Sequence, residues 1–330
     1  MSLRSLNTFG IDAQADAYLP IESLTQLMAL REDAALMQMP RLLLGGGSNL
    51  LLTGDFHGLV LHSCSRGIEL ISQQGDTVRV RAAAGEAWQT LVDWTLQHQL
   101  GGLENLSLIP GSVGAAPIQN IGAYGAEVAN TIESVTVFDF DSGVCKTIDR
   151  TTCAFGYRDS IFKHALRARV MILDVTFTFT RRWKPNLRYA ELADALATVA
   201  EPTLQQVSDA VCAIRRRKLP DPAVIGNAGS FFKNPVVAQS QRDQLLTQFP
   251  ALVSHDQPDG TTKLAAAWLI DQCGWKGRSL GAAGVHQYQP LVLVNRGGAQ
   301  GADIVRLAEA ITADVWQRFA VTLEPEPIFI

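Results

Sequence analysis

The chain has 330 residues, a formal net charge of −4, 47% hydrophobic residues and 18% charged residues. This length exceeds one ordinary core and predicts two or three domains of a soluble globular protein. The acidic balance disfavours a nucleic-acid binder, no stretch has the length of a membrane span, and the N-terminus lacks the apolar segment of an export signal.

The cysteines are odd in number, scattered and without CxxC spacing: Cys64, Cys145, Cys153, Cys212 and Cys273. This pattern favours reduced thiols in a cytoplasmic protein over disulfides or zinc. The histidines show no HExxH or comparable ligand spacing, so we predict no structural metal.

The first part of the chain predicts α+β structure with antiparallel pairs rather than a regular βαβ repeat. Apolar residues at helical spacing predict helices over residues 21–31 and 86–100. Alternation and turn chemistry predict strands over residues 78–83, 134–140, 144–148 and 170–180.

The second part of the chain begins with a helix and a linker. Thr203 and Gln206 form a capping box, and the helix ends in a basic stretch from Arg215 to Lys218. These residues complement the helix dipole; alternatively, one or two of them reach a phosphate. Asp221-Pro222 then links to a second unit, with helices expected over 263–273 and after Asp303 and a strand over 291–294.

Residues 45–49, which we name the first glycine loop, read GGGSN between two apolar runs. A P-loop needs Lys-Ser/Thr after its glycines, and a Rossmann motif needs a third glycine where Leu50 stands, so neither fingerprint fits. The residues are compatible with a phosphate loop or with a simple hairpin turn.

Residues 109–125, the second glycine loop, read IPGSVGAAPIQNIGAYG. From Ala82 to Cys145 the chain contains no Lys or Arg. A phosphate bound here would therefore be held by backbone N–H groups. A packed Gly/Ala turn without a ligand is the alternative, but the length of the run and the paired amides of Gln119 and Asn120 favour a bound dinucleotide.

Three further segments carry candidate chemistry. Ser230 lacks the second glycine of a hydrolase GxSxG elbow, so it is a proton donor or a turn-capping serine. Glu324 and Glu326 precede prolines that keep them extended, as converging carboxylates or as a solvated tail. Arg158 can stabilise a carboxylate or enolate, or contact Asp159 locally.

Together, these segments resemble one flavoprotein family of bacterial cell-wall synthesis, the UDP-N-acetylenolpyruvoylglucosamine reductases (UDP-N-acetylmuramate dehydrogenases). The tyrosine in LRYAEL indicates the longer of the family's two types. The resemblance covers nearly the whole chain, through GGGSN at Gly45, IPGSVGAAPIQNIGAYG at Ile109, FGYRDSIFK at Phe155, KLPDP at Lys218, GNAGSFFKNP at Gly226 and KLAAAWLIDQCG at Lys263.

The resemblance implies an α+β fold, with an FAD-binding domain of the vanillyl-alcohol-oxidase (PCMH) type and a C-terminal α+β substrate domain. Residues 1–66 would form a first FAD-binding subdomain, which residues 321–330 can join. Residues 67–218 would form the second subdomain with the Tyr189 loop, and residues 219–320 the substrate-binding domain.

The resemblance also implies the chemistry. FAD would bind non-covalently, NADPH would reduce it, and the enolpyruvyl UDP-sugar would receive a hydride from flavin N5 and a proton at the neighbouring carbon. Ser230 would donate that proton, while Arg158 and Glu326 would polarise the enolpyruvyl carboxylate. No nucleic acid, membrane or obligate protein partner is implied.

By motif position, the remaining site residues fall into two groups. The predicted cofactor-binding residues lie in the two glycine loops: Gly45, Gly47, Ser48, Asn49, Pro110, Gly111, Gly114, Ala115, Ala116, Gln119, Asn120, Gly122, Ala123 and Tyr124. The predicted substrate-binding residues are Tyr189, which would close over the nucleotide, and Arg215, Lys218, Asn234, Lys263 and Gln289.

The sequence departs from the family pattern at two places and leaves two rivals. Ala115-Ala116 stand where relatives often carry hydroxyl residues, and Pro327-Ile328 where some carry an arginine. One rival is another FAD oxidoreductase of the same fold acting on a small alcohol or sugar. Such enzymes often attach flavin through histidine, which both glycine loops lack. The other is a non-catalytic nucleotide-sugar-binding module, which the presence of Ser230 and Arg158 disfavours.

Overall fold

The computed structural model describes residues 1–330 and divides into two compact units. Unit 1 comprises Met1 and residues 15–47 and 57–217. Unit 2 comprises residues 2–14, 48–56 and 218–330. Short N-terminal pieces therefore belong to the same unit as the C-terminal third of the chain. None of the helices has the length and hydropathy that a membrane-spanning segment needs.

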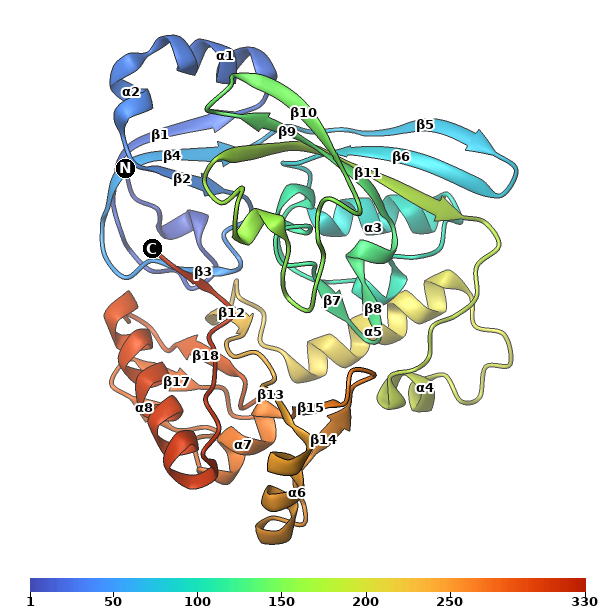
Figure 1. The fold of residues 1–330 in the computed structure, drawn as a ribbon, viewed down its shortest axis with the longest axis vertical. Helices are drawn as coiled ribbons and strands as arrows, with labels where there is room; N and C mark the ends of the chain where they lie inside the picture. Colours follow the sequence, from blue (N-terminus) through green and yellow to red (C-terminus); the bar gives the residue numbers. More distant parts are fainter. The chain divides into compact units, whose positions relative to one another are not determined.

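Unit 1 contains a five-stranded antiparallel sheet, ordered β10-β9-β11-β6-β5, and a three-stranded sheet, ordered β1-β4-β2 (Figure 1). Two short strands of two residues each, β7 and β8, form a hairpin that begins in the second glycine loop and ends just after it. The strands are β1 (Ala15–Ile21), β2 (Arg41–Leu44), β4 (Phe56–Ser63), β5 (Ile68–Gln74), β6 (Thr77–Ala83), β7 (Gly122–Ala123), β8 (Ala126–Glu127), β9 (Ile132–Asp139), β10 (Val144–Asp149) and β11 (Val170–Thr180).

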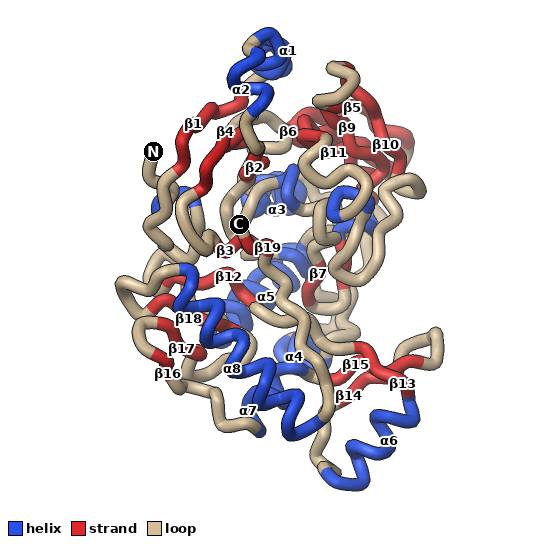
Figure 2. Tube along the Cα trace, turned by 60° about the vertical axis from the view of Figure 1, so that its left-hand side comes forward, coloured by secondary structure: helices blue, strands red, loops and turns tan.

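Unit 1 also contains helices, and one of them, α3, packs against a face of the five-stranded sheet. Trp88, Leu91 and Val92 of α3 pack with Val80 and Val175 of the sheet in one buried cluster, and Figures 1 and 2 show α3 against that face. The α-helices are α1 (Leu24–Glu32), α2 (Ala34–Gln38), α3 (Trp88–Gln97), α4 (Ala190–Ala195) and α5 (Leu204–Lys218), and the 3-10 helices are η2 (Glu104–Leu106), η3 (Val113–Ala115), η4 (Val128–Asn130) and η5 (Ile161–Lys163).

Unit 2 contains a four-stranded sheet, β12-β18-β17-β16, a three-stranded sheet, β13-β15-β14, and the parallel pair β19-β3. Its long helix α8 buries the predicted stripe of Ile304, Leu307, Ile311 and Val315, and it lies along the four-stranded sheet (Figure 1). The strands are β3 (Leu50–Leu51), β12 (Gly226–Ser230), β13 (Val236–Ala238), β14 (Ser254–Asp256), β15 (Thr261–Leu264), β16 (Ser279–Leu280), β17 (Ala283–Val285), β18 (Val292–Asn295) and β19 (Ile328–Phe329). The helices are η1 (Arg4–Leu6), α6 (Gln239–Gln248), α7 (Ala266–Gln272) and α8 (Gly301–Phe319).

The structure confirms most of the predicted elements and corrects two. The hairpin alternative for the first glycine loop is wrong, because β2 pairs with β4 and β3 pairs with β19. The helix expected over 263–273 begins only at Ala266. Residues 261–264 instead form β15, which has a partner strand on each side. Tertiary pairing thus overrides a helical pattern that local residues suggested.

Two observations support the three-part division of the chain, which we keep as a proposal. The strands of the sheet β1-β4-β2 lie before residue 66, and those of the five-stranded sheet lie after it. Residues 321–330 pair through β19 with β3, which lies within residues 1–66.

Asp139 holds the β9–β10 hairpin. Its buried carboxylate accepts hydrogen bonds from Lys146 Nζ at 2.6 Å and from Arg169 Nη2 at 3.2 Å. The lysine hydrogen bond holds the pKa of Asp139 well below its usual value of 3.8. Because folding lowers this pKa, the ionised carboxylate stabilises the fold above the unfolded-state pKa. That contribution is lost as the pH falls through the folded-state pKa.

Asp139→Asn should therefore lower the urea midpoint of unfolding at pH 7. The difference from the unmodified chain should shrink as the pH falls below about 4, where the unfolded state takes up its proton. Asp141→Asn is the matched control, because Asp141 is exposed and contacts Arg169 from the same hairpin. Equal losses in the two variants would contradict the role of Asp139.

Gly301 begins α8 directly against the main chain of Leu52, so an added Cβ would overlap the Leu52 carbonyl oxygen. Gly301→Ala should lower the free energy of unfolding by about 1–3 kcal/mol, although alanine favours helices. In Gly54→Ala, the added Cβ would have no atom within 4 Å, so this variant should stay within about 1 kcal/mol of the unmodified chain. Urea unfolding followed by circular dichroism tests both, and an undisturbed Gly301→Ala would refute the packing argument.

Candidate active site

The second glycine loop is fixed to the segment between β6 and α3. Gly114 N donates to Ala84 O at 2.8 Å, Val113 N donates to Glu86 O at 2.9 Å, and Trp88 N donates to Gly111 O at 3.0 Å. Gly114 also lies so close that an added Cβ would be 2.5 Å from the Ala84 Cβ. The start of the loop is therefore a rigid extension of the core of unit 1.

The two glycine loops meet main chain against main chain within unit 1. A Cβ on Gly46 would lie 2.6 Å from Gly111 Cα, and one on Gly45 would lie 2.6 Å from Ser112 Oγ. Gly47 and Gly111 have φ values of 62° and 128°, which side chains disfavour. Only glycine permits this approach, so the run of glycines in both loops has a structural cause.

This junction has the properties of a site for a pyrophosphate-containing group. The amides of Gly46 and Gly111 donate to no backbone acceptor of the protein. Ser112 is 7% exposed, and its hydroxyl has no hydrogen-bond partner. Unpaired buried polar groups are rare and call for a ligand or water. The residues present therefore fit FAD, whose phosphates would take hydrogen bonds from amides and a hydroxyl rather than from cations.

Ser112 is a candidate that the sequence reasoning missed. The signal was present, because Ser112 stands within the IPGSVG motif between Gly111 and Gly114. Ala115-Ala116 lack the hydroxyl groups that the resemblance places at those positions. The buried Ser112 hydroxyl lies at the same junction and can supply a hydrogen bond of the kind that those alanines cannot.

The rest of the second glycine loop is held by its own side chains. Asn120 is 1% exposed and has a left-handed backbone with φ 44°. Its carboxamide donates to Glu127 Oε2 at 2.9 Å and to Gly156 O at 3.0 Å, and it accepts from Ala129 N at 3.0 Å. The Asn120 side chain therefore bonds to the protein, which leaves its main chain for the predicted cofactor contact. Gln119 beside it is half-buried.

Arg158 reaches the same loop from residues 156–159, which we name the arginine turn. Arg158 Nη2 donates to Gly122 O at 2.8 Å. The carboxylate of the neighbouring Asp159 contacts His164 Nε2 at 2.8 Å. The structure thus brings the predicted catalytic arginine to the predicted cofactor loop.

Tyr124, Arg215 and Tyr189 form a third group within unit 1. The ring centroids of Tyr124 and Tyr189 lie 5.0 Å apart, edge to face, and Tyr124 is hydrogen-bonded to Arg215. Burial raises the pKa of Tyr124 and lowers the pKa of Arg215. Arg215 Nε is buried without a hydrogen-bond partner, so it has a donor left for the predicted contact with substrate. The neighbouring Arg217 instead forms an ion pair with Glu191.

The segments that carry Ser230 and Glu326 are paired within unit 2. Ser230 ends β12, which shifts register against β18 after Asn227, and Gly229 has φ 70°. The next residues pair with the C-terminal segment, since Glu326 N donates to Phe231 O at 2.8 Å and Lys233 N donates to Glu324 O at 2.9 Å. This antiparallel pairing sets the glutamate beside the strand end that carries the serine.

The two glutamates of that segment have different surroundings. Glu324 Oε1 forms an ion pair with Lys233 Nζ at 2.7 Å, and the Glu324 side chain is 69% exposed. Asn49 of the first glycine loop contacts the main chain of Glu326, because Asn49 Nδ2 donates to Glu326 O at 3.4 Å and Ile328 N donates to Asn49 O at 3.0 Å. Glu324 thus has a structural partner, and Glu326 lies with a predicted cofactor residue.

The other predicted substrate residues lie at several places in unit 2. Lys218 ends α5, and Lys263 lies in the middle strand β15. Asn234 Oδ1 accepts from Ala266 N at 3.0 Å and so caps α7. Gln289 Oε1 accepts from Leu291 N at 3.4 Å. Asn234 and Gln289 therefore each have a structural contact besides any contact with substrate.

Comparison with known proteins yields matches in both parts of the chain. The family model described as the FAD binding domain matches residues 15–149, and the one described as UDP-N-acetylenolpyruvoylglucosamine reductase, C-terminal domain, matches residues 221–330. The UDP-N-acetylenolpyruvoylglucosamine reductase of Paraburkholderia xenovorans (strain LB400) is 52% identical over 330 residues, covering 99% of this chain and 95% of the relative. That of Burkholderia multivorans (strain ATCC 17616 / 249) is 53% identical with the same coverage.

The fold has a counterpart among solved structures. The crystal structure of UDP-N-acetylenolpyruvylglucosamine reductase from Thermus caldophilus aligns with a TM-score of 0.70 at 22% identity, covering 100% of this chain and 97% of that one. This match and the two family models confirm the predicted α+β fold with an FAD-binding domain and a C-terminal domain. By its full-length identity with the curated relatives, the chain belongs to the UDP-N-acetylenolpyruvoylglucosamine reductase family.

Proposed function

We propose that the chain is an NADPH-dependent flavoenzyme that reduces UDP-N-acetylglucosamine enolpyruvate to UDP-N-acetylmuramate, a step of peptidoglycan synthesis. Membership of the family and the matched FAD binding domain support this activity. The alternative, an FAD oxidoreductase acting on a small alcohol or sugar, is not favoured because the C-terminal domain also matches the family. The observation that carries the assignment is the main-chain pairing that brings Glu326 beside the strand end bearing Ser230.

FAD would be held by the two glycine loops. Main-chain amides at Gly46 and Gly111 and the Ser112 hydroxyl are the groups without protein partners, and they supplement the residues predicted by motif position. When bound, FAD supplies the hydride, drawn from NADPH, that the methylene carbon of the enolpyruvyl group receives. The cofactor would be non-covalent, since neither loop contains a histidine.

The chain's own residues would then supply the proton and stabilise charge. Ser230 would donate its hydroxyl proton to the carbon that carries the carboxylate, and solvent would reprotonate it. Arg158 would polarise that carboxylate and stabilise negative charge as it develops, and Glu326 would do so as the neutral acid, by donating a hydrogen bond. Tyr189, Arg215, Lys218, Asn234, Lys263 and Gln289 would bind the UDP-sugar. Tyr189 contacts Tyr124, which is hydrogen-bonded to Arg215, and this grouping supports a common role of Tyr189 and Arg215 in binding substrate.

We also propose a cytoplasmic location without an obligate protein partner. All five cysteines are free thiols, which suits a reducing compartment. Burial raises the pKa of the Cys153 thiol to about 12, so this thiol stays protonated at neutral pH.

A spectral experiment tests the proposed function directly. Purified protein should show flavin absorbance, NADPH should bleach it without oxygen, and anaerobic reoxidation should require the enolpyruvyl UDP-sugar. A protein that stays colourless after incubation with FAD would refute the proposal, as would reoxidation by simple alcohols or sugars alone.

Ser112→Ala should weaken FAD binding while leaving the fold intact. The loss of one hydrogen bond of about 1–2 kcal/mol corresponds to a dissociation constant raised by about 5- to 30-fold. Fluorescence titration of deflavinated protein with FAD measures this, with Ser142→Ala, in the exposed β9–β10 turn, as the matched control. Unchanged affinity in Ser112→Ala would remove Ser112 from the cofactor site.

Ser230→Ala should separate the two half-reactions. Bleaching by NADPH should keep its rate, because it needs no proton from Ser230. Reoxidation by the enolpyruvyl UDP-sugar should slow by about 10²- to 10⁴-fold, the usual contribution of a positioned proton donor. Ser240→Ala, at an exposed position of α6, is the control. Normal reoxidation in Ser230→Ala would exclude Ser230 as the donor.

A further inference from the structure

The arginine turn has a strained backbone that needs support. Gly156 N donates to Asp159 O at 3.0 Å and Asp159 N donates to Gly156 O at 3.3 Å, which closes the turn with Tyr157 and Arg158 at its tip. Arg158 has φ 55°, in the left-handed region that costs free energy for a residue with a side chain. Such conformations persist where surrounding contacts determine them, and they are frequent at functional sites.

Lys163 Nζ donates to Arg158 O at 3.1 Å, and three further hydrogen bonds that support the turn come from or reach the second glycine loop. Asn120 Nδ2 donates to Gly156 O at 3.0 Å, at the base of the turn. Arg158 Nη2 donates to Gly122 O at 2.8 Å, and Ser160 Oγ donates to Ile118 O at 2.6 Å just after the turn. The arginine turn and the loop of residues 118–122 therefore form one hydrogen-bonded assembly.

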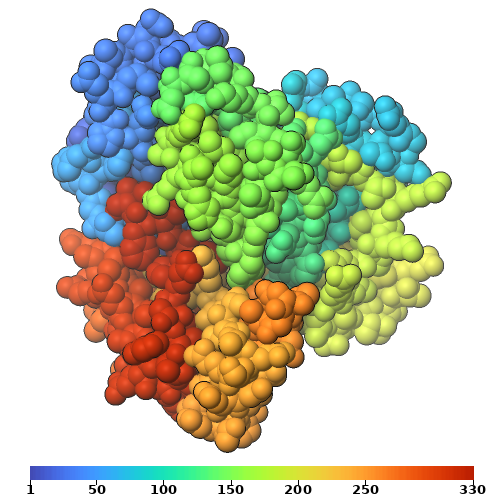
Figure 3. All heavy atoms as spheres, in the orientation of Figure 1, coloured from blue at the N-terminus to red at the C-terminus, as the bar shows by residue number.

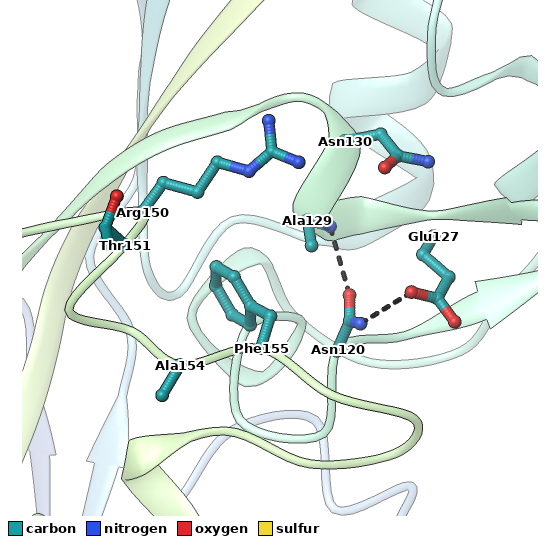
Figure 4. Close-up of a pocket in the computed structure, with 8 residues that line it drawn as sticks. All are labelled: Asn120, Glu127, Ala129, Asn130, Arg150, Thr151, Ala154 and Phe155. Atoms are coloured by element: carbon teal, nitrogen blue, oxygen red, sulfur yellow. Dashed lines mark hydrogen bonds between the residues drawn. The ribbon is translucent and has the colours of Figure 1, made fainter. Parts of the chain in front are cut away.

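Asn120 is the centre of this assembly. Besides Gly156 O, its carboxamide contacts Glu127 Oε2 and Ala129 N, so both N–H groups and the oxygen bond to protein groups. Figure 4 shows the side chain directed toward Ala129 and Glu127, which lie on the β8–η4 segment. A single buried amide thus joins the glycine loop, the segment after it and the arginine turn. No other residue type can donate twice and accept once with this geometry.

The far side of Asn120 borders an open pocket rather than the core. This pocket, of about 350 Å³, is lined by Asn120, Glu127, Ala129, Asn130, Arg150, Thr151, Ala154 and Phe155 (Figure 4). Arg150, Thr151 and Ala154 are exposed, and Figure 3 shows in green the broad surface that this part of the chain forms on unit 1. A shortened side chain at position 120 would therefore admit water, and its effect should be confined to the hydrogen bonds it removes.

We propose that Asn120 is a positioning residue for Arg158. Its carboxamide fixes the arginine turn on the second glycine loop, so that the guanidinium keeps one position relative to the loop that would hold FAD. The inference rests on the proposed function, in which Arg158 polarises the enolpyruvyl carboxylate. In this role the Asn120 side chain acts through Arg158 rather than by contacting the cofactor directly.

The test uses the full-length holoenzyme and measures three quantities: FAD affinity, the rate of bleaching by NADPH, and the rate of anaerobic reoxidation by the enolpyruvyl UDP-sugar. At FAD concentrations that saturate the variant, Asn120→Ala should still be bleached by NADPH. Its reoxidation should slow by about 10²-fold, the effect of a misplaced catalytic group. Asn130→Ala is the matched control, because Asn130 lines the same pocket, is exposed and has no hydrogen bond to the turn. If Asn120→Ala does not fold, Asn120→Ser replaces it, since Ser keeps a polar group at this position and adds no negative charge beside Glu127 Oε2.

A double variant separates positioning from general damage. If Asn120 acts through Arg158, Asn120→Ala should slow reoxidation much less in an Arg158→Lys background than in the unmodified chain. Full additivity of the two losses, normal reoxidation in Asn120→Ala, or a defect explained by lost FAD would each overturn the inference. If Arg158→Lys itself turns over normally, the proposed role of Arg158 fails; if only Arg158→Lys is impaired, the positioning role of Asn120 fails alone.

Discussion

The contact between Gly46 and Gly111 is the constraint on which the candidate site depends. Two main chains that approach this closely leave no room for side chains. The amides of Gly46 and Gly111 donate to no main-chain acceptor of the protein. In the proposed cofactor site, backbone dipoles would perform the task that lysine or arginine performs elsewhere. This explains why a stretch of more than sixty residues without a cation, from Ala82 to Cys145, can belong to a phosphate-binding unit.

In unit 2, main-chain pairing brings together the segments that carry Ser230 and Glu326, which are distant in the sequence. The pairing of residues 231–233 with 324–326 uses Glu326 N and Glu324 O, while the alternating Pro325 and Pro327 lack an N–H. Pro325 is exposed and Pro327 is buried, and neither can donate a main-chain hydrogen bond to a further strand. The residue pattern that looks like a flexible acidic tail is thus a paired segment, with Glu324 in an ion pair with Lys233 and Glu326 in the proposed site.

The sequence predicted the fold wherever local pattern and tertiary environment agree. The strand at 170–180 is the clear case, because Val175, Phe177 and Phe179 are buried as their alternation indicated. Prediction failed at Lys263, where two neighbouring strands outweigh the helical spacing of the residues that follow. The motifs predicted candidate site residues, but they did not reveal the unpaired Ser112 hydroxyl or the fully hydrogen-bonded Asn120. Those properties depend on partners far along the chain, such as Gly156.

The interleaving of the two units has a consequence for how the chain reaches its native state. Asn227 N donates to Thr8 O, Asn295 Nδ2 donates to Phe9 O, and β3 pairs with β19, so residues 2–14 and 48–56 complete their pairing only with the last third of the chain. During synthesis these early segments can pair with each other, as Phe56 N does with Gln14 O, but they complete unit 2 only when the ribosome has released almost the entire polypeptide. Cutting the chain at residue 218 would leave unit 1 in one piece but would separate residues 2–14 and 48–56 from the rest of unit 2, so an intact unit 2 requires rejoined segments rather than simple truncation.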